Sequence, residues 1–495
     1  MEAALAQLKD RVAEIHDLDR ASSLLGWDQQ VKMPPGGAGV RAEQLATLNR
    51  LAHEALTSDE MGELLESLAG VEEELDPESD ERALIRLVRR DWDKARRVPA
   101  DLQAEMTRAA SLAMPVWVKA RQDSDFSQFL PALRQNFELR RRYVECFDDY
   151  DEPYDVLLDD FEPGMKTAEV RAVFERLKQE QIPFVAEVKQ EGERPLRGVT
   201  YPIEAQKAFE LKVIERFGFD PAEWRLDPAV HPFASSIATT DIRLTTRYFE
   251  DNLDGLFGTM HETGHGLYEH GVDRALERTP LAHGASLGFH ESQSRMWENM
   301  VGRSLPFWRH FFPLLQQHFP EALGGATLDD WYRTVNWVEP SLIRVEADEA
   351  TYNLHIILRF ELEQELLAGS VDLEELPAIW NARMRDYLGV EPPNDALGVL
   401  QDMHWAVGAI GYFSTYALGN VISGQLWERV TAEIPDLHEQ FERGEFGPLA
   451  EWLRETLWRH GRKFTPAELI QRSTGGGLDP EPYLRYLRGK YPLAG

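Results

Sequence analysis

Residues 261–265 read His-Glu-Thr-Gly-His, and this pentapeptide determines how the rest of the chain is interpreted. On a helix, positions i and i+4 lie one turn apart on the same face, so His261 and His265 can direct two imidazole nitrogens at one metal ion. Glu262 stands between them, where a carboxylate can take a proton from a metal-bound water. The pattern is typical of a catalytic zinc site.

The sequence around the pentapeptide favours a helix that buries one face. Apolar or small residues recur at helical spacing from Leu253 to Tyr268. Asp251 and Asn252 are candidate caps at the start, and Gly271 is a candidate stop. A chance match would more often straddle a turn or lie on a polar surface, so this context supports the metal site.

A catalytic zinc site usually has three protein ligands and one position left for water. The candidate third ligand is Glu291, far enough along the chain for it to leave one helix, turn through residues 284–288 and return on a second helix. Taken alone, Glu291 would be interpreted as a solvated surface carboxylate. The two histidines upstream make it the predicted third ligand of one metal ion per chain.

Composition limits the classes of protein that are compatible with the chain. Its 495 residues are 43% hydrophobic and 10% aromatic, enough for a large buried core. The formal net charge of −32 argues against nucleic-acid binding, which needs a basic surface. It also disfavours anionic membrane surfaces, and no apolar run reaches transmembrane length.

The cysteine content and the first residues indicate the cellular compartment of the protein. Cys146 is the one cysteine, so no intramolecular disulfide can form, which fits a reducing cytoplasm. Because Phe147 follows it, we expect Cys146 in the core rather than as a nucleophile. Residues 1–4 lack the basic and apolar regions of a signal peptide. We therefore expect a cytoplasmic protein.

Hydrophobic spacings of three and four predict helix through most of the chain, at residues 5–15, 45–68, 129–147, 167–190, 354–368 and 446–460. Strand signals concentrate at 235–249 and predict a small sheet immediately before the metal helix. The acidic run 71–81 reads as a solvated linker. We expect a mainly α protein with a single domain over residues 1–495, its two lobes flanking a groove that leads to the metal.

Further strings accompany the metal helix in a fixed order. They are His231-Pro232-Phe233, Asp241-Ile242-Arg243-Leu244-Thr245, His290-Glu291-Ser292-Gln293, Ile343-Arg344-Val345-Glu346-Ala347-Asp348 and Gly398-Val399-Leu400-Gln401-Asp402-Met403-His404-Trp405. Together they resemble the thermostable (Taq-type) metallocarboxypeptidase family of bacteria and archaea. Segments 25–28, 33–36, 154–160 and 480–491 extend the resemblance over essentially the whole chain.

The resemblance implies a helical, neurolysin-like body with a deep central groove, a homodimer, and a divalent metal that is zinc, or cobalt in some members. It also implies removal of single residues from peptide C-termini with broad tolerance of side chains. An oligopeptidase or dipeptidyl carboxypeptidase with the same zinc site is the alternative. A binding protein without catalysis is disfavoured, because every residue that the chemistry needs is present. One departure is Ser414, where the family pattern has proline.

Hydrolysis of a peptide also needs a base and donors for the developing oxyanion. Glu262 is the predicted base. Resemblance to neurolysin-like enzymes indicates His404 and one or both of Tyr412 and Tyr416 as donors. One continuous helix would put His404 and Tyr412 on the same side, but two intervening glycines leave that continuity open, and core packing is the alternative for the tyrosines. Asp402 is predicted to orient a ligand or the donor histidine.

A carboxypeptidase needs a cation for the terminal carboxylate of its substrate, and the fork of an arginine grips both oxygens. Arg344 is the first candidate and Arg243 the second. The alternatives are internal salt bridges, Arg344 with Asp348 and Arg243 with Asp241. His231 precedes a proline, so its extended backbone could project the ring into the groove, although a core histidine is equally compatible.

Overall fold

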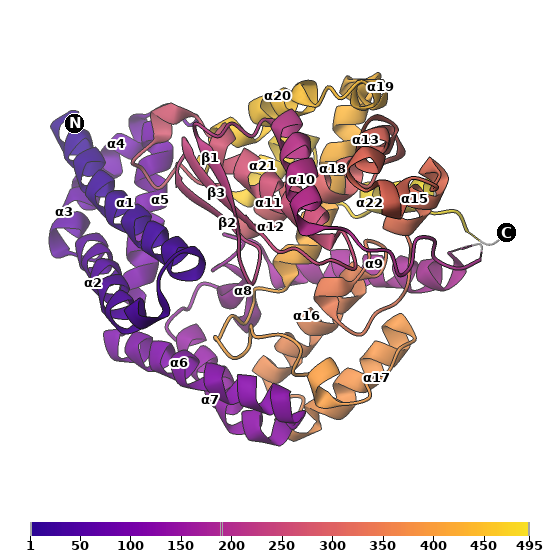
Figure 1. The fold of residues 1–495 in the computed structure, drawn as a ribbon. Helices are drawn as coiled ribbons and strands as arrows, with labels where there is room; N and C mark the ends of the chain where they lie inside the picture. Colours follow the sequence, from indigo (N-terminus) through magenta and orange to yellow (C-terminus); the bar gives the residue numbers. More distant parts are fainter. Residues whose placement is uncertain (1, 189, 191, 494–495) are drawn as a thin grey trace.

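The computed structural model describes residues 2–188, 190 and 192–493, which are mostly helical with one small sheet in mid-chain (Figure 1). The helices before the sheet are α1 (Glu2–Val31), α2 (Ala38–Leu56), α3 (Asp59–Ser67), α4 (Ala69–Glu74), α5 (Asp80–Arg97), α6 (Ala100–Asp123), α7 (Phe126–Val144), α8 (Pro153–Leu158), α9 (Thr167–Glu187) and α10 (Ile203–Phe217). Those after it are α11 (Asp254–Gly271), α12 (Leu287–Arg295), α13 (Leu305–His318), α14 (Pro320–Leu323), α15 (Leu328–Val335), α16 (Tyr352–Ala368), α17 (Leu376–Leu388), α18 (Ser414–Glu433), α19 (Leu437–Glu442), α20 (Gly447–Thr456), α21 (Pro466–Thr474) and α22 (Glu481–Lys490). The predicted mainly α fold is confirmed.

The sheet has three strands, β1 (Trp224–Pro228), β2 (Ala234–Ala238) and β3 (Asp241–Thr246), in the order β1-β3-β2. β1 is parallel to β3, and β2 is antiparallel to it, with Ser235 opposite Arg243. Buried Ile242 and Leu244 face α11, which packs on β3. The predicted sheet at 235–249 is confirmed for β2 and β3. β1 was not predicted, because its five residues carry no alternating pattern and end in proline.

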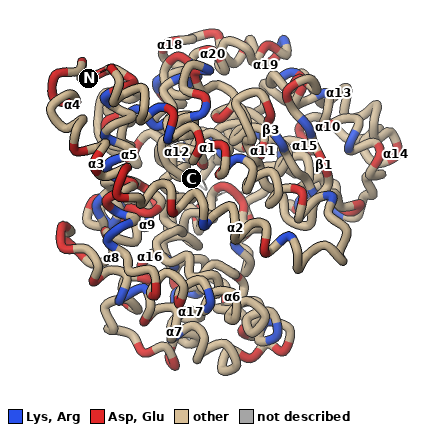
Figure 2. The backbone as a smooth tube through the Cα atoms, turned by 90° about the vertical axis from the view of Figure 1, so that its left-hand side faces the viewer, with Lys and Arg blue, Asp and Glu red and all other residues tan. Residues whose placement is uncertain are grey.

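The helices surround the sheet on several sides. In both Figure 1 and Figure 2, α6, α7 and α17 form the lower end of the molecule. Helix α1 packs beside β2. One large hydrophobic core holds buried side chains from Ala113 to Tyr491. A second core joins Leu8 and Val12 of α1 to α3, α5 and residues 272–282. The helix that carries the His-Glu-x-x-His motif lies between these parts.

Helices α11, α12 and α18 pack unusually closely, and glycines permit it. A Cβ on Gly264 would lie 2.6 Å from the carbonyl oxygen of Gln293 in α12. A Cβ on Gly419 of α18 would lie 2.6 Å from the Cβ of Glu291. Since real Cβ atoms do not approach so closely, only glycine fits at these two positions. The contact sets the position of Glu291 relative to α11.

The ends of several helices refine the sequence predictions. The acidic run 71–81 is not an extended linker, because its first half belongs to α4 and α5 begins at Asp80. The predicted helix 45–68 breaks before α3, where the Ser58 side chain accepts from the Met61 N–H. Asn252 accepts from the Asp254 N–H, as expected of a cap for α11. Cys146 is half-buried and packs against a small apolar cluster.

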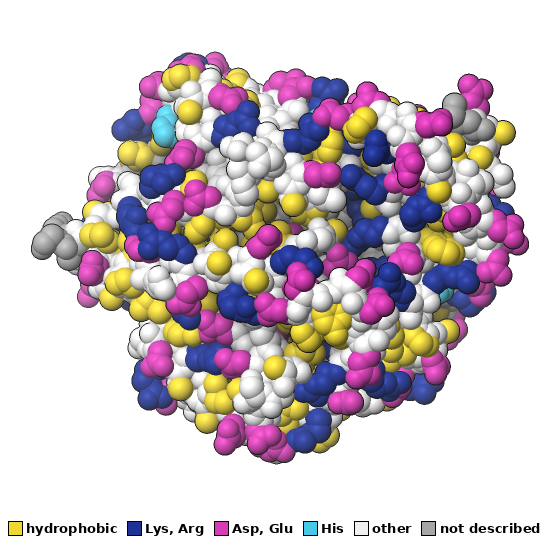
Figure 3. All heavy atoms as spheres, turned by 180° about the vertical axis from the view of Figure 1, so that it is seen from behind, with side chains coloured by type: hydrophobic (Ala, Val, Ile, Leu, Met, Phe, Trp, Pro, Cys, Tyr) yellow, Lys and Arg dark blue, Asp and Glu magenta, His cyan; other side chains and the backbone are white. Residues whose placement is uncertain are grey.

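The surface carries both signs of charge. Acidic and basic side chains are interspersed with apolar ones over the face seen in Figure 3. Among residues 2–188, 190 and 192–493, no helix has the length and apolarity that crossing a membrane requires.

Candidate metal centre

Helices α11 and α12 bring the three predicted ligands together. Oε2 of Glu291 lies 3.7 Å from Nε2 of His261 and 3.7 Å from Nε2 of His265. The three ligand atoms all lie within 4.8 Å of one another. Tetrahedral coordination with bonds of about 2.0–2.2 Å separates ligand atoms by roughly 3.3–3.6 Å, so this donor set fits one divalent metal ion.

Neighbouring side chains orient two of these ligands. Nδ1 of His261 lies 2.9 Å from Oε2 of Glu298, which fixes the tautomer that leaves Nε2 free for a metal. Arg295 donates from Nε to Oε1 of Glu291 at 2.7 Å, which leaves Oε2 as the free oxygen. The guanidinium of Arg295 also lies 4.0 Å from the centre of the Tyr352 ring. The ligands are therefore aimed before any metal binds.

Glu298 was not identified from the sequence. Burial opposes its ionisation, but the hydrogen bond from His261 and the charge of Arg295 hold the pKa of its carboxyl well below the usual range. It lies in a π-helical segment (Met296–Val301) that continues α12. The signal that could have revealed it is the spacing of seven residues from Glu291, two helical turns on the same face.

Glu262 belongs to α11 and is buried where this helix meets the edge of the sheet. Burial raises the pKa of its carboxyl to about 7, against the lowering effect of the His261 charge and of a hydrogen bond from the backbone of Ala234 in β2. Its side chain is 7% exposed, whereas those of His261 and His265 retain 18% and 20% exposure. The site is thus open to solvent on the histidine side.

The three predicted oxyanion donors also lie together. The His404 and Tyr416 rings each lie 5.3 Å from that of Tyr412, and the Tyr416 hydroxyl lies 3.4 Å from Nε2 of His404. Burial, and then the negative charge of Glu291 among other groups, raises the pKa of both tyrosines. The donors therefore lie within electrostatic reach of the third ligand.

No helix joins His404 to Tyr412. Residues 401–413, all of them described, form turns, with φ of 72° at Gly408 and 100° at Gly411. α18 begins at Ser414, whose hydroxyl donates to the Gly411 carbonyl at 3.2 Å. The shared side expected from helical spacing thus arises from a folded loop. Ser414, where the resemblance led us to expect proline, contributes one hydrogen bond to that loop.

Arg344 is buried beside the donor cluster. Its Nε lies 3.0 Å from Oδ1 of Asp402, its Nη1 donates to the Tyr352 hydroxyl at 2.9 Å, and its guanidinium lies 4.8 Å from the centre of the Tyr416 ring. The salt bridge proposed as an alternative, with Asp348, is wrong. Asp348 instead accepts backbone N–H groups, including that of Ala350. Asp402 lies 3.8 Å from Nδ1 of His404, too far for a hydrogen bond, so its influence on this histidine is electrostatic.

Arg243 and His231 are placed differently. Both ends of the Arg243 guanidinium pair with Asp241 at 2.9 Å, and the group lies 4.5 Å from the ring centre of Trp27 in α1. Because Ile242 and Leu244 face α11, Arg243 lies on the other side of the sheet. His231 is exposed in the turn before β2. No hydrogen bond or ion pair found within the described part of the chain joins either residue to the metal triad.

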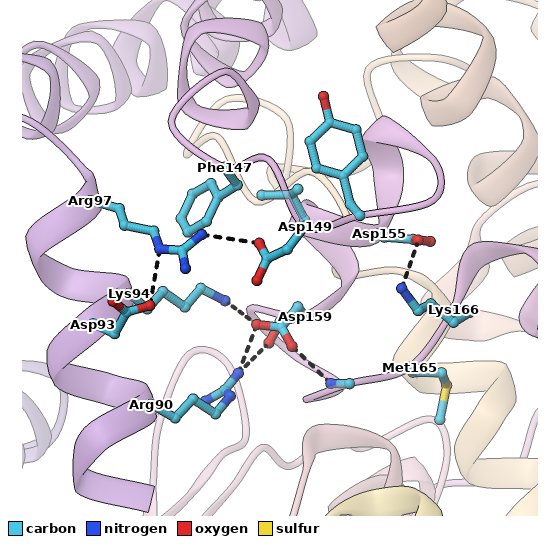
Figure 4. A pocket seen from close by; sticks show the side chains of 13 residues that line it. Arg90, Asp93, Lys94, Arg97, Phe147, Asp149, Asp155, Asp159, Met165 and Lys166 are labelled. Atoms are coloured by element: carbon cyan, nitrogen blue, oxygen red, sulfur yellow. Dashed lines mark hydrogen bonds and ion pairs between the residues drawn. The ribbon is translucent and has the colours of Figure 1, made fainter.

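A separate cavity of about 240 Å³ lies between α5 and residues 147–166 (Figure 4). Its cations are paired with carboxylates from the same lining: Arg97 with Asp93 and Asp149, Arg90 and Lys94 with Asp159, and Lys166 with Asp155. The charges are satisfied internally, so this cavity links two parts of the fold and presents no catalytic pair.

A helical body that presents two histidines and a carboxylate to one metal, with a buried glutamate beside them, defines a class of metal-dependent peptidases. The comparisons with known proteins identify the family. The chain belongs to the Carboxypeptidase Taq (M32) metallopeptidase family, whose family model matches residues 7–491. It is therefore a metallocarboxypeptidase, and the resemblance found in the sequence is confirmed.

Individual relatives cover the whole chain. It is 42% identical to thermostable carboxypeptidase 1 of Thermus thermophilus, over 99% of this chain and 98% of that protein. It is 38% identical to carboxypeptidase 1 of Bacillus subtilis, over 97% of both. Among solved structures, the M32 carboxypeptidase from Deinococcus radiodurans R1 matches with a TM-score of 0.95 and 40% identity, over 99% of this chain and 98% of that one. Trypanosoma cruzi metallocarboxypeptidase 1 matches with a TM-score of 0.91 and 31% identity, over 99% and 100%.

Proposed function

We propose that this carboxypeptidase removes single residues from the C-termini of peptides, with broad tolerance of side chains, at one zinc ion per chain. The observation that carries the proposal is the convergence of Glu291 on the His261 and His265 pair. Cobalt is the alternative ion. When bound there, the metal would polarise the scissile carbonyl and make a water molecule acidic.

Glu262 is the proposed general base and acid. A base that first takes a proton from the attacking water and then gives it to the leaving amine works best with a pKa near the working pH. Burial raises the pKa of the Glu262 carboxyl toward that range, whereas the charge of a bound metal ion would lower it. Its hydrogen bond from Ala234 holds the carboxylate at the edge of the sheet, next to where a substrate backbone would lie.

The edge of β2 that faces away from β3 is the proposed binding site for the substrate backbone. Thr245 bonds to Phe233, so in this antiparallel pair Ala234 and Ser236 direct their backbone groups away from β3. Two of these groups are occupied by side chains of the protein, since Glu262 bonds to the Ala234 N–H and Arg20 donates to the Ser236 carbonyl. The Ala234 carbonyl and the Ser236 N–H are therefore the groups proposed for an extended peptide, whose main-chain hydrogen bonds are indifferent to side-chain identity. This supports broad specificity.

His404, Tyr412 and Tyr416 are the proposed donors to the oxyanion. Burial, together with the charges of Arg344 and Arg359, lowers the pKa of His404 to about 4, although Asp402 opposes the shift. The ring is therefore neutral at pH 7 and donates a single N–H. Burial raises the pKa of both tyrosines, so their hydroxyls keep their protons. Neutral donors already in place suit a charge that develops only in the transition state.

Arg344 is the proposed partner of the substrate's terminal carboxylate. It lies against Tyr416, beside the donors, whereas Arg243 faces Trp27 across the sheet. Arg243 and His231 therefore remain weaker candidates for substrate contact. Arg344→Lys should raise KM for free-acid peptides far more than for amidated ones. An equal effect on both would remove Arg344 from carboxylate recognition.

The runner-up is an oligopeptidase or dipeptidyl carboxypeptidase on the same site. We would incubate one peptide as the free acid and as the C-terminal amide, and follow the products by mass spectrometry. Release of single residues from the acid alone supports the carboxypeptidase. Equal cleavage of both forms would support the oligopeptidase, and release of dipeptides the second alternative.

Glu262→Gln tests the base directly. The variant should keep its metal content and lose about 10³-fold or more in kcat, since amide cannot exchange the proton. Retained turnover would contradict the role of Glu262.

We also propose that residues 1–495 form one domain, its lobes flanking a groove to the metal, and that two copies associate in the cytoplasm. Peptides are the proposed partners, and nucleic acid and membranes are not. The continuous core from Ala113 to Tyr491 supports the single domain, and the excess of acidic residues supports the absence of nucleic acid. Light scattering of the purified protein tests the dimer, and a monomer at micromolar concentration would contradict it.

A further inference from the structure

Glu363 of α16 is a fully buried carboxylate that touches neither the metal ligands nor the donors. Its Oε1 accepts from Nε1 of Trp405 at 2.7 Å. Its Oε2 accepts from the Tyr154 hydroxyl at 2.6 Å and from the Gly411 N–H at 2.9 Å. Trp405 directly follows His404 and Gly411 directly precedes Tyr412, so one side chain holds both ends of the segment between the two proposed donors.

One turn earlier on the same helix, Arg359 binds the segment that precedes His404. Its Nε donates to Oδ2 of Asp402 at 2.7 Å, and the side chain is fully buried. The guanidinium lies 4.6 Å from the ring centre of Trp380, which fixes its plane. Residues at i and i+4 share a helix face, so α16 presents a guanidinium and a carboxyl group to the same loop, and burial raises the pKa of the Glu363 carboxyl to about 7.

The loop itself forms turns rather than a helix or a strand. Gly411 has a positive φ, and a Cβ there would lie 2.7 Å from the carbonyl oxygen of Leu157, so the backbone is pressed against α8. Turn hydrogen bonds within the loop, such as that from the Ala409 N–H to the His404 carbonyl, set its local shape, and side chains from other elements fix where it lies. Asn136 and Arg140 of α7 donate to the carbonyls of Trp405 and Gly408, whereas Arg359 and Glu363 are the contacts from α16 on the two sides of His404.

We propose that Arg359 and Glu363 are positioning residues for catalysis. Their two sets of contacts form a clamp on residues 402–411, and this clamp fixes His404 and Tyr412 relative to the metal ligands. The inference rests on the oxyanion role proposed above for those two residues. It gives Glu363 and Arg359 a function that is separate from metal binding, because the ligands lie on α11 and α12.

A carboxylate is specifically required at position 363. In Glu363→Gln, the amide nitrogen would face either the indole N–H of Trp405 or the backbone N–H of Gly411, so either orientation sets two donors against each other. Glu361→Gln is the matched control. That carboxylate lies on the same helix and accepts from Lys178 Nζ at 2.6 Å and Tyr387 hydroxyl at 2.5 Å, but neither partner belongs to the loop.

The first experiment measures kcat, KM and metal content for both variants. A displacement of donors by about 1 Å costs on the order of 10²-fold in rate, so Glu363→Gln should lower kcat roughly 10- to 100-fold with KM within about threefold and full metal content. Glu361→Gln should stay within about twofold of the wild type in kcat. Equal losses of kcat in the two variants, or loss of metal from Glu363→Gln, would overturn the proposal.

A double-mutant cycle separates positioning from general stability. In a His404→Ala, Tyr412→Phe background both proposed donors are already gone, so adding Glu363→Gln should lower kcat further by less than about threefold. Full additivity of the two losses would overturn the clamp. If His404→Ala alone leaves kcat unchanged, it is the proposed role of His404 that fails, and the two failures are thus distinguishable.

Arg359→Lys provides an independent test should Glu363→Gln not fold. Lysine keeps the charge but loses the planar fork that grips Asp402. We expect a kcat loss of about tenfold at full metal content. The control is Arg383→Lys, which removes a comparable bidentate pair, with Glu365, on the outer side of α16. Equal effects of the two lysine variants would contradict a positioning role for Arg359.

Discussion

The proposed metal ligands and the proposed aromatic donors lie in neighbouring parts of the structure, but the chain positions them in opposite ways. His261, His265 and Glu291 stand on two helices whose glycines let them pack almost backbone to backbone. His404 and Tyr412 stand on a loop of turns that is held by buried side chains from another helix. In the first region, helical periodicity determines the relative positions of the side chains. In the second region, long-range ion pairs and hydrogen bonds determine them.

The difference shows what each region can tolerate. A helix pair keeps its ligands in place as long as its packing surface is intact, whatever the charges around it. A loop fixed by buried charges depends on each partner, since removing one leaves the other buried without compensation. Substitutions in the two regions should therefore have different signatures in metal content and turnover.

The largest effect is expected in the helix pair. Glu291→Ala removes one of three ligands and leaves Arg295 without its carboxylate. Outer partners of ligands already contribute about 10- to 100-fold to metal affinity, so losing a ligand should cost more than about 10³-fold in activity, with loss of stoichiometric metal. Elemental analysis after dialysis is the measurement. Undiminished metal content would show that the triad is not the site.

Asp402→Asn breaks the loop region. It leaves the buried guanidinium groups of Arg344 and Arg359 without a counter-charge, which should cost about 3–5 kcal/mol of stability. It should also lower kcat about 10- to 100-fold at unchanged metal content, because the loop that carries His404 loosens. Urea unfolding, steady-state kinetics and metal analysis on one preparation test this. Loss of metal from Asp402→Asn would contradict the proposed difference between the two regions.

Glu210 tests whether charge matters beneath the metal helix. It accepts from the Thr259 hydroxyl at 2.9 Å, and burial raises its pKa to about 7. Because this folded pKa lies above the unfolded value of 4.5, the stabilising contribution is full below pH 4.5 and is lost as pH rises through 7. Glu210→Gln cannot ionise, so its stability relative to the wild type should improve by roughly 2 kcal/mol from pH 5 to pH 8. Denaturant unfolding at both pH values measures it, and no change in the difference would show that Glu210 is already charged when folded.

The smallest effects come from a pair of glycines on α11. Gly264→Ala forces a methyl group into the backbone of α12 and should destabilise by about 1–3 kcal/mol while weakening metal binding. Gly258 has open space around its Cβ position, so Gly258→Ala should instead stabilise by about 0.5–1 kcal/mol. Thermal unfolding and metal titration compare the two. Opposite signs are expected, and similar behaviour would mean that close packing does not set the ligands.

This contrast also explains what the sequence could predict. His261 and His265 follow the rule of helical spacing, and Glu291 was predicted on a second helix further along the chain, so the group that the structure brings together could be predicted from the sequence. The sheet at 235–249 was predicted from its composition. Glu298 was missed because its only signal is the spacing of two helical turns from Glu291, which many surface carboxylates share.

The loop region was harder to derive from sequence, because its partners are far apart along the chain. The salt bridge expected for Arg344 was the local one, with Asp348, whereas the structure pairs it with Asp402. Glu363 contacts Tyr154 on one side and Gly411 on the other. Such pairings depend on how α8 and α16 pack in three dimensions, and neither composition nor periodicity contains that information.

The close packing of Gly419 against Glu291 has a consequence for how the chain is synthesised. A chain still attached to the ribosome completes its ligand set at residue 291, but α18 and the loop before it emerge more than a hundred residues later. Throughout that interval the nascent polypeptide carries all three proposed ligands but lacks the helix that packs on Glu291. The close contact that sets the position of Glu291 therefore forms only after α18 has been synthesised.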